Sequence, residues 1–189
     1  MKKNTLALVI VTLIIILSIG SFYFPLSSKA LEDKIYLQKG YDLSVVNDSV
    51  PVDFQFEESW LALEPGEEKM INKVLVEEES STVILNRIIR SDDGRLISIE
   101  LNSEHSFKNN RKGRFLSSLQ ISGQSFLKNN KWSIYSNQKE VIKEAGIING
   151  TGGGPAELNL VNLDYQKVSN VEKPFIISFE YMLYEYEKK

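Results

Sequence analysis

Apolar and polar residues alternate with a period of two over much of the chain after residue 50. In "VPVDFQF" the four apolar residues share one face, and Pro51 lies between the first two. In "FIISFEYML", from Phe175 to Leu183, every second residue is apolar. A period of two places successive side chains on opposite faces of a strand. Because proline donates no backbone hydrogen bond, Pro51 predicts an edge strand or a strand start.

The segments between these two strands show the same pattern, interrupted by polar turns. Asp93-Gly94 suits a hairpin turn that needs positive φ, and Trp132 and Ile134 share a face after an Asn-rich turn. Only "NQKEVIKEAG" has helical spacing, and it predicts one or two turns of helix. The other predicted strands are 72–78, 82–90, 95–101, 114–122 and the segment "ELNLVNLDYQ".

About eight strands joined by short turns predict an all-β fold, an antiparallel immunoglobulin-like β-sandwich over residues 50–189. The strand–helix alternation of a nucleotide-binding fold is absent from the sequence. Residues 31–49 are polar and mildly amphiphilic, and they are interpreted as a lead-in or stalk.

The first thirty residues indicate a membrane-directed segment. Lys2 and Lys3 precede 22 uncharged residues, Thr5 to Leu26, which is long enough for a transmembrane helix. Small residues at 28 and 30 also fit a signal peptide cleaved near Ala30, so signal anchor and signal peptide both stay open. In either case we expect the folded part to be extracytoplasmic, at the cell membrane or secreted.

Charge and composition exclude several classes. Three of the 22 basic residues lie in the first thirty positions, which leaves 19 against 25 acidic residues in the remainder. That balance disfavours a nucleic-acid partner, which needs clustered Lys and Arg. The absence of cysteine excludes disulfides, thiolate metal sites and thiol nucleophiles.

The glycine-rich stretch "GIINGTGGGP", residues 146–155, is interpreted as a loop between strands. A phosphate-binding loop needs a strand before it, a helix after it and usually a Lys with Ser or Thr. Here Pro155 and a strand pattern follow the glycines. We therefore expect no nucleotide cofactor.

Three sets of residues could carry chemistry. His105 is the only histidine and lies in a polar segment, where it is interpreted as solvated, although a Ser–His–acid group assembled in space stays possible. Glu77, Glu78 and Glu79, with Asp92 and Asp93 one strand away, match no calcium-loop spacing. Glu57 and Glu58 near Trp60 give a weak match to paired carboxylates beside a sugar-stacking ring. No catalytic, cofactor or metal site is predicted.

The last strand offers a possible partner surface. Met182, Tyr184 and Tyr186 alternate with the apolar face and are expected to point to solvent. Tyrosines are enriched at interfaces because a rigid ring carries a hydroxyl. The alternative is that both faces of this strand are packed.

The order of parts resembles membrane-tethered β-sandwich surface proteins of Gram-positive bacteria, such as the ectodomains of anti-sigma-factor-like proteins. The uncharged segment 5–26, "KVLVEEESSTVILNRII" and "GIINGTGGGPAELNL" carry the resemblance. It implies an extracellular β-sandwich behind a membrane helix. Because only four residues precede that segment, we expect no sigma-binding part, and no functional residue is carried over.

The sequence therefore predicts a non-enzymatic, extracytoplasmic binding or accessory module of the bacterial cell envelope, attached to the membrane through its N-terminal helix. Its partner would be an envelope protein or a wall polymer. Two alternatives stay open: a hydrolase acting on wall polymer or peptide, and a structural surface protein that assembles through exposed strand edges.

Overall fold

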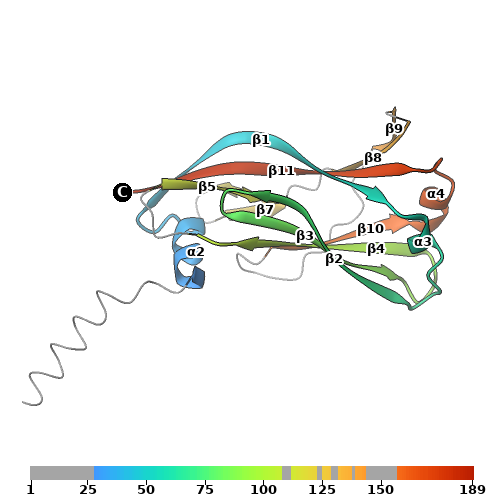
Figure 1. Cartoon of the computed structure of the whole chain (residues 1–189). Helices are drawn as coiled ribbons and strands as arrows, with labels where there is room; N and C mark the ends of the chain where they lie inside the picture. Colours follow the sequence, from blue (N-terminus) through green and yellow to red (C-terminus); the bar gives the residue numbers. More distant parts are fainter. Residues whose placement is uncertain (1–27, 108–111, 123–124, 129–131, 138, 144–156) are drawn as a thin grey trace, which may run out of the picture.

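Two antiparallel sheets face each other in the computed structural model and give a mostly β, sandwich-like fold (Figure 1). The structure describes residues 28–107, 112–122, 125–128, 132–137, 139–143 and 157–189. The predicted all-β fold class is confirmed at this level. The predicted strand count is too low, because the described residues alone form eleven strands.

The first sheet is built around the C-terminal strand. One edge of β11 (Phe175–Lys188) pairs with β1 (Tyr41–Phe56), and its other edge is shared by β5 (Lys112–Ser117) and β8 (Trp132–Ser136). β9 (Lys139–Lys143) continues the sheet beyond β8. β1 is thus an edge strand, as Pro51 predicts.

The second sheet has the order β10-β4-β3-β2. Its members are β2 (Glu68–Glu78), β3 (Ser81–Arg90), β4 (Leu96–His105) and β10 (Glu157–Asp164). The predicted hairpin between β3 and β4 is confirmed: Gly94 has φ 69°, and its N–H donates to the Ser91 carbonyl over 2.8 Å. A separate two-stranded ribbon contains β6 (Leu119–Ser122) and β7 (Ser125–Lys128).

A bulge divides β3 into two halves of opposite parity. Leu85 pairs with Leu101 and Arg87 pairs with Glu100, so Asn86 is the extra residue. Before the bulge the odd-numbered residues of β3 are buried, and after it the even-numbered Ile88 and Arg90 are buried. A bulge shifts the side-chain alternation by one residue, so it decides which later side chains face the core.

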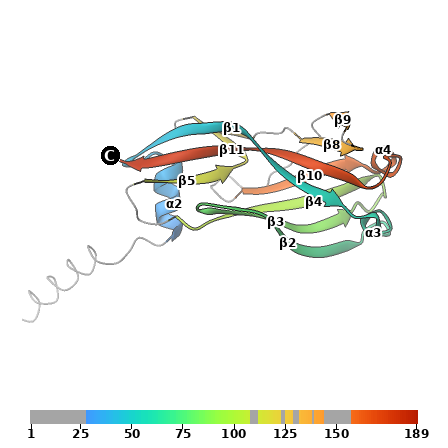
Figure 2. The ribbon, with the colours of Figure 1, turned by 45° about the horizontal axis from the view of Figure 1, so that its top comes forward.

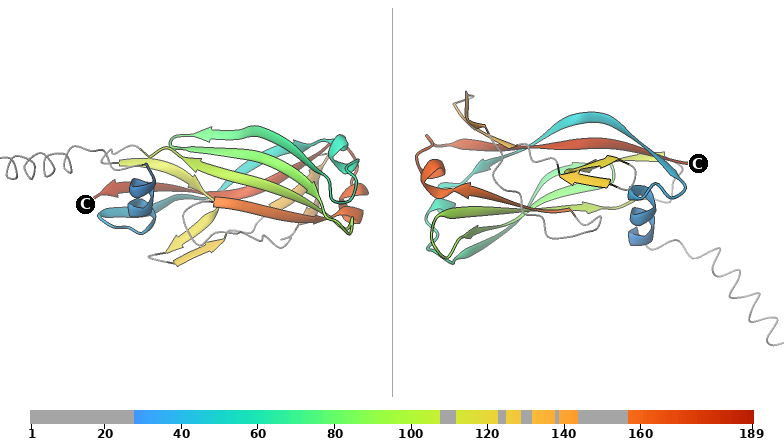
Figure 3. Two further views of the ribbon diagram at one scale, coloured as in Figure 1. Left: turned by 90° about the horizontal axis from the view of Figure 1, so that it is seen from below. Right: turned by 180° about the vertical axis from the view of Figure 1, so that it is seen from behind.

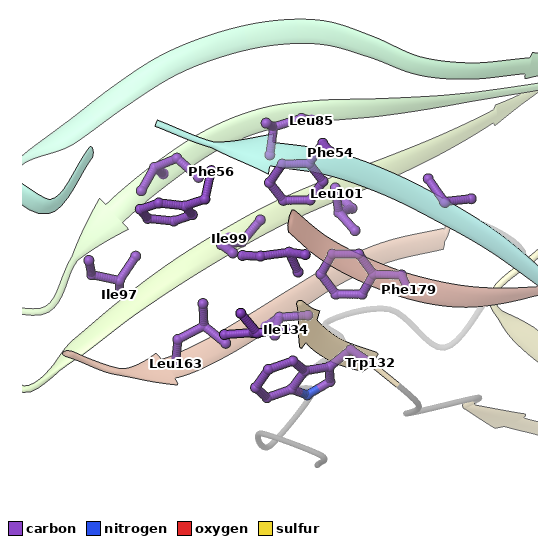
Figure 4. Close-up of a cluster of buried hydrophobic side chains, with 14 of the residues drawn as sticks. Phe54, Phe56, Leu85, Ile97, Ile99, Leu101, Trp132, Ile134, Leu163 and Phe179 are labelled. Atoms are coloured by element: carbon purple, nitrogen blue, oxygen red, sulfur yellow. The ribbon is translucent and has the colours of Figure 1, made fainter. Parts of the chain in front are cut away.

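The main core lies between the two sheets (Figure 4). Phe54 of β1 stacks on Phe179 with ring centroids 5.9 Å apart, and Phe56 stacks on Phe175 at 4.9 Å. Trp132 and Ile134 of β8 are also buried there, as their shared face predicts. These stacked pairs come from strands that are register partners, so sheet pairing and core packing support each other.

A second core lies at the end of the sandwich that holds α2 (Ser28–Tyr36) and the C-terminus (Figures 1 and 3). Leu31, Ile35 and Tyr36 of this helix are at most 2% exposed. The prediction of a stalk over 31–49 is wrong, because α2 is packed and residues 41–49 form the first part of β1 on β11. The folded domain includes residues 28–49 and does not begin at 50.

The predicted helix around residues 137–146 is also wrong for the residues that the structure describes. Lys139–Lys143 form β9 and pair with β8, where Ile142 lies opposite Ile134. Pairing with a neighbouring strand overrides the weak helical spacing. The described helices besides α2 are short: α3 (Glu58–Leu61) and α4 (Tyr165–Ser169), which Asp164 caps through the Lys167 N–H. Both lie at the end opposite α2 (Figure 2).

Two sequence predictions concern residues that lie outside the described part of the chain. They are the membrane-directed segment 5–26 and the glycine-rich stretch 146–155. Among the described residues, no helix has both the length and the apolar character needed to cross a membrane.

Candidate functional site

The predicted partner surface on β11 is wrong, because its three side chains are buried. Met182 is 7% exposed, and Tyr184 and Tyr186 are each 1% exposed. All three belong to the second core, where they pack with α2 and with Phe115 of β5. The helix that the sequence pattern places in a stalk covers the face that was expected to meet solvent.

The hydroxyl of Tyr184 has a structural role. The hydroxyl accepts the N–H of Ile121 at 2.8 Å and donates to the carbonyl of Leu119 at 3.1 Å. It therefore fixes β6 against β11. A buried tyrosine normally finds such polar partners, because an unpaired hydroxyl in the core is costly.

His105 is a half-buried connector between three elements and is not the solvated histidine that the sequence predicts. Its Nε2 lies 2.9 Å from the hydroxyl of Tyr36 in α2, and its Nδ1 lies 3.1 Å from Oγ of Ser81 in β3. The rings of Phe107 and Phe115 lie 5.3 and 5.6 Å from it, measured between centroids. In either neutral tautomer both ring nitrogens can form these hydrogen bonds.

Ser81 is poorly placed to act as a nucleophile. It is 3% exposed, and its Oγ accepts the backbone N–H of Leu116 at 2.8 Å. A catalytic serine needs an approach for substrate beside its base. The Tyr36–His105–Ser81 group therefore fits a role in attaching α2 and β5 to the second sheet.

The carboxylate candidates are separated by the fold. Glu77, Glu78 and Glu79 lie at one end of β3, whereas Asp92 and Asp93 lie at its other end. Within the described ranges, no group of three or more His, Cys, Asp or Glu residues is arranged to hold a metal ion.

Trp60 cannot stack on a sugar beside Glu57 and Glu58, because it is 1% exposed and packs on Phe56. Glu58 instead pairs with the amino group of Lys173 at 3.1 Å. The hypothesis of paired carboxylates beside an exposed ring is therefore wrong.

The strongest candidate site centres on Arg90, the last residue of β3. Its side chain lines a hollow of about 480 Å³ at the end of the sandwich that carries α4. The residue is only 8% exposed, and its guanidinium carbon lies 3.1 Å from the ring centroid of Tyr165. Its Nε is buried and has no hydrogen-bond partner among the described residues. Arg90 also forms no ion pair within that part of the chain.

An arginine in this state is unusual on energetic grounds. Guanidinium stays protonated in proteins, so burial cannot be relieved by loss of the proton. Removing such a charge from water costs several kcal/mol, and stacking on Tyr165 returns about 2 kcal/mol. The protein does not compensate the buried charge by its own contacts.

Arg87, three residues earlier on the same strand, has its charge balanced by two carboxylates. Its guanidinium lies 2.8 Å from Glu100 and 2.8 Å from Glu68. The hydrogen bonding that Arg87 donates to Glu100 raises the pKa of Arg87. The contrast between Arg87 and Arg90 shows that the fold can pair an arginine of this strand and does not pair the second one.

The rim of the hollow carries charges of both signs. Arg95, Asp93 and Asp164 line it together with Gln166. Asp93 accepts from Oγ of Ser91 at 2.7 Å and from the Arg95 N–H at 3.0 Å, and the first of these bonds chiefly lowers its pKa. Both acids thus hold the local backbone, since Asp164 caps α4.

A second hollow, of about 530 Å³, lies between β8, β9 and the segment after α4. Its polar side chains are satisfied by the protein: the Asn137 amide donates to Glu172 at 2.8 Å, and Ser136 Oγ donates to the Glu172 carbonyl. Its two lysines, Lys139 and Lys167, are exposed. It lacks the buried unpaired group that distinguishes the Arg90 hollow.

Sequence reasoning missed Arg90 because strict alternation places it on the outer face of β3. The odd-numbered residues from 81 to 85 face the core, which by simple parity brings Arg87 inward and leaves Arg90 outside. The bulge at Asn86 reverses this assignment. The available signal was the run "NRIIR", in which two arginines flank two isoleucines, so that no single parity keeps both charges outside.

The sequence matches no protein-family model, and neither the curated proteins nor the solved structures give a match.

Proposed function

We propose that this chain is a non-enzymatic binding or accessory module of the bacterial cell envelope. It consists of an extracytoplasmic, immunoglobulin-like β-sandwich behind an N-terminal signal anchor or signal peptide, as in the membrane-tethered surface proteins that the sequence resembles. Its partner is an envelope protein or a wall polymer, and binding takes place at the hollow around Arg90.

The observation that carries the proposal is Arg90 in that hollow, a residue only 8% exposed whose buried Nε has no hydrogen-bond partner among the described residues. A buried charge without a partner lowers the stability of the free protein. Such a group is therefore expected where it serves a function. The other chemically active group, around His105, has its polar atoms engaged in contacts that hold α2 and β5. Binding therefore explains the observed side chains better than hydrolysis does.

The position of the hollow supports an accessory role at a membrane. α2 follows directly after the uncharged N-terminal segment, and it lies at the opposite end of the sandwich from α4 (Figure 1), whose residues Tyr165 and Gln166 line the hollow. A chain anchored through residues 5–26 would present the hollow away from the membrane, towards the wall.

The test uses the full-length chain in the cells that make it. A photo-crosslinking amino acid at exposed Gln166, on the rim of the hollow, should give a crosslinked envelope component, whereas the same amino acid at exposed Lys39, beside α2, should not. Protease added to intact cells with the wall removed should digest the domain. Protection from this protease, or equal crosslinking from both positions, would contradict the proposal.

Hydrolysis is tested in the same cells. A chain with Glu57→Gln, Glu58→Gln and His105→Gln should still restore a deletion strain, provided that the variant accumulates at the normal level. Failure to restore at a normal level would favour the hydrolase.

A further inference from the structure

We propose that Arg90 binds a carboxylate group, so that the hollow recognises a ligand bearing a free carboxylate. This inference rests on the proposed binding function and names the chemical class that the same hollow takes. The ligand sources that share this chemistry are a peptide with its C-terminal carboxylate and an acidic sugar of a wall polymer.

The first argument is the geometry of the guanidinium. Arginine offers five N–H donors in a planar fork that matches a carboxylate in a bidentate contact. Tyr165 covers one face of the guanidinium, and its own hydroxyl lies 3.3 Å from the Leu61 carbonyl, to which it donates. The ring is therefore fixed, and it fixes the plane of the guanidinium. An anion approaches such a stacked guanidinium at its edge, where the N–H groups point.

Gly94 keeps the space beside the guanidinium open. A Cβ on Gly94 would lie 3.4 Å from a terminal nitrogen of Arg90 and 3.3 Å from Cγ of Pro65. The positive φ of 69° also favours glycine at this position. The turn between β3 and β4 thus leaves room next to Arg90 where any other side chain would intrude.

The charges on the rim favour a carboxylate over phosphate. Arg90 and Arg95 face Asp93 and Asp164 around the same hollow, so the four charges sum to zero. A ligand carrying two negative charges on one group would meet about twice the repulsion from the aspartates that a singly charged carboxylate meets. Arg95 already pairs with Asp93 at 3.7 Å, which leaves Arg90 as the cation for the ligand. A cationic group on the same ligand could lie near the aspartates.

The test is a titration of the full-length chain in detergent micelles, followed by NMR at constant ionic strength. The reporter is the backbone amide of Gly94, which lies in the hollow and is present in every variant. The probes are acetate, N-acetylalanine as a peptide end, glucuronate as an acidic sugar, and inorganic phosphate. We expect a saturable shift in the millimolar range with acetate and a tighter one with either N-acetylalanine or glucuronate, which identifies the source.

Three variants separate specific recognition from general attraction of anions. Arg90→Met should abolish the saturable shift, and Arg90→Lys, which keeps the charge without the fork, should weaken it at least fivefold. Arg114→Met is the matched control, because it removes one positive charge from β5 at the other end of the sandwich, and it should leave the titration unchanged.

The outcomes decide the proposal in each case. A shift that persists in Arg90→Met, or phosphate that binds as tightly as the carboxylates, overturns it. If Arg90→Met does not fold, the guanidinium N–H resonances of Arg90 in the wild-type protein decide: they should move with acetate, and unmoved resonances overturn the proposal. Crosslinking from Gln166 in cells without any response to carboxylates would leave the binding function standing and reject only the ligand class.

Discussion

The hydroxyl of Tyr184 offers a sharp test of whether the second core is a real part of the folded domain. Tyr184→Phe removes one oxygen from a residue that is 1% exposed. It leaves the buried N–H of Ile121 without its acceptor at 2.8 Å, whereas the Leu119 carbonyl loses the Tyr184 donor at 3.1 Å but keeps the one from Ser117 Oγ at 3.3 Å. An unsatisfied buried polar group costs about 1–3 kcal/mol, so we expect a loss of about 2 kcal/mol in the free energy of unfolding.

The matched control is Tyr41→Phe in the same core. Tyr41 is 3% exposed and packs edge-on against Tyr186, but its hydroxyl forms no hydrogen bond with any residue in the described ranges. We expect its loss to change the free energy of unfolding by less than about 0.5 kcal/mol.

Urea unfolding followed by tryptophan fluorescence measures both variants, because Trp60 and Trp132 are buried in the main core. For a domain of this size, about 2 kcal/mol corresponds to a fall of about 4–8 °C in Tm. Equal stability of the two variants would refute the reasoning, since it would mean that the Tyr184 hydroxyl does not hold β6. An intact main-core transition with a separate, earlier loss of α2 would refute a single cooperative domain.

Three further predictions follow from the same structure. Gly113→Ala should lower the free energy of unfolding by about 1–3 kcal/mol, because a Cβ there would lie 2.5 Å from the Tyr186 hydroxyl; thermal melting measures this loss, and an unchanged Tm would contradict the overlap. Ile35→Ala should cost about 2–5 kcal/mol in urea unfolding, since Ile35 is 0% exposed, whereas a stalk residue would cost almost nothing. Hydrogen bonds from Lys112 and Arg114 lower the pKa of Glu185 below its usual 4.5. The stabilising effect of Glu185 is therefore present above pH 4.5 and is lost as the pH falls through the lowered pKa. Glu185→Gln should reduce the loss of unfolding free energy at acid pH, and parallel curves of unfolding free energy against pH for the two proteins would contradict this.

The sequence pattern predicts the sheets well where one face of a strand is apolar and the other is polar. Phe175 to Leu183, the Asp93-Gly94 hairpin and the Trp132–Ile134 face are all found in the structure. The pattern fails where both faces of a strand are buried. On β11, Tyr181 and Met182 are consecutive and both buried, one in each core.

The failures share a physical cause, which is that distant segments decide what a local pattern means. α2 has too few apolar residues to stand out, yet three of them complete the second core. The bulge at Asn86 has no glycine to mark it, and it moves Arg90 from solvent into a hollow. The candidate site could not be predicted because it depends on this one-residue shift and on Tyr165, 75 positions later in the chain.

The most direct measurement of the central claim is the free energy of unfolding of Arg90→Met. If Arg90 is a binding group that the fold leaves uncompensated, methionine should keep or increase the stability, because replacing a buried charge by an apolar side chain is often neutral or stabilising by about 1–4 kcal/mol. Arg87→Met, which leaves buried Glu100 without its cation, should lose about 1–3 kcal/mol in the same urea titration. A loss for Arg90→Met as large as that for Arg87→Met would contradict the account, since Arg90 would then be a structural residue.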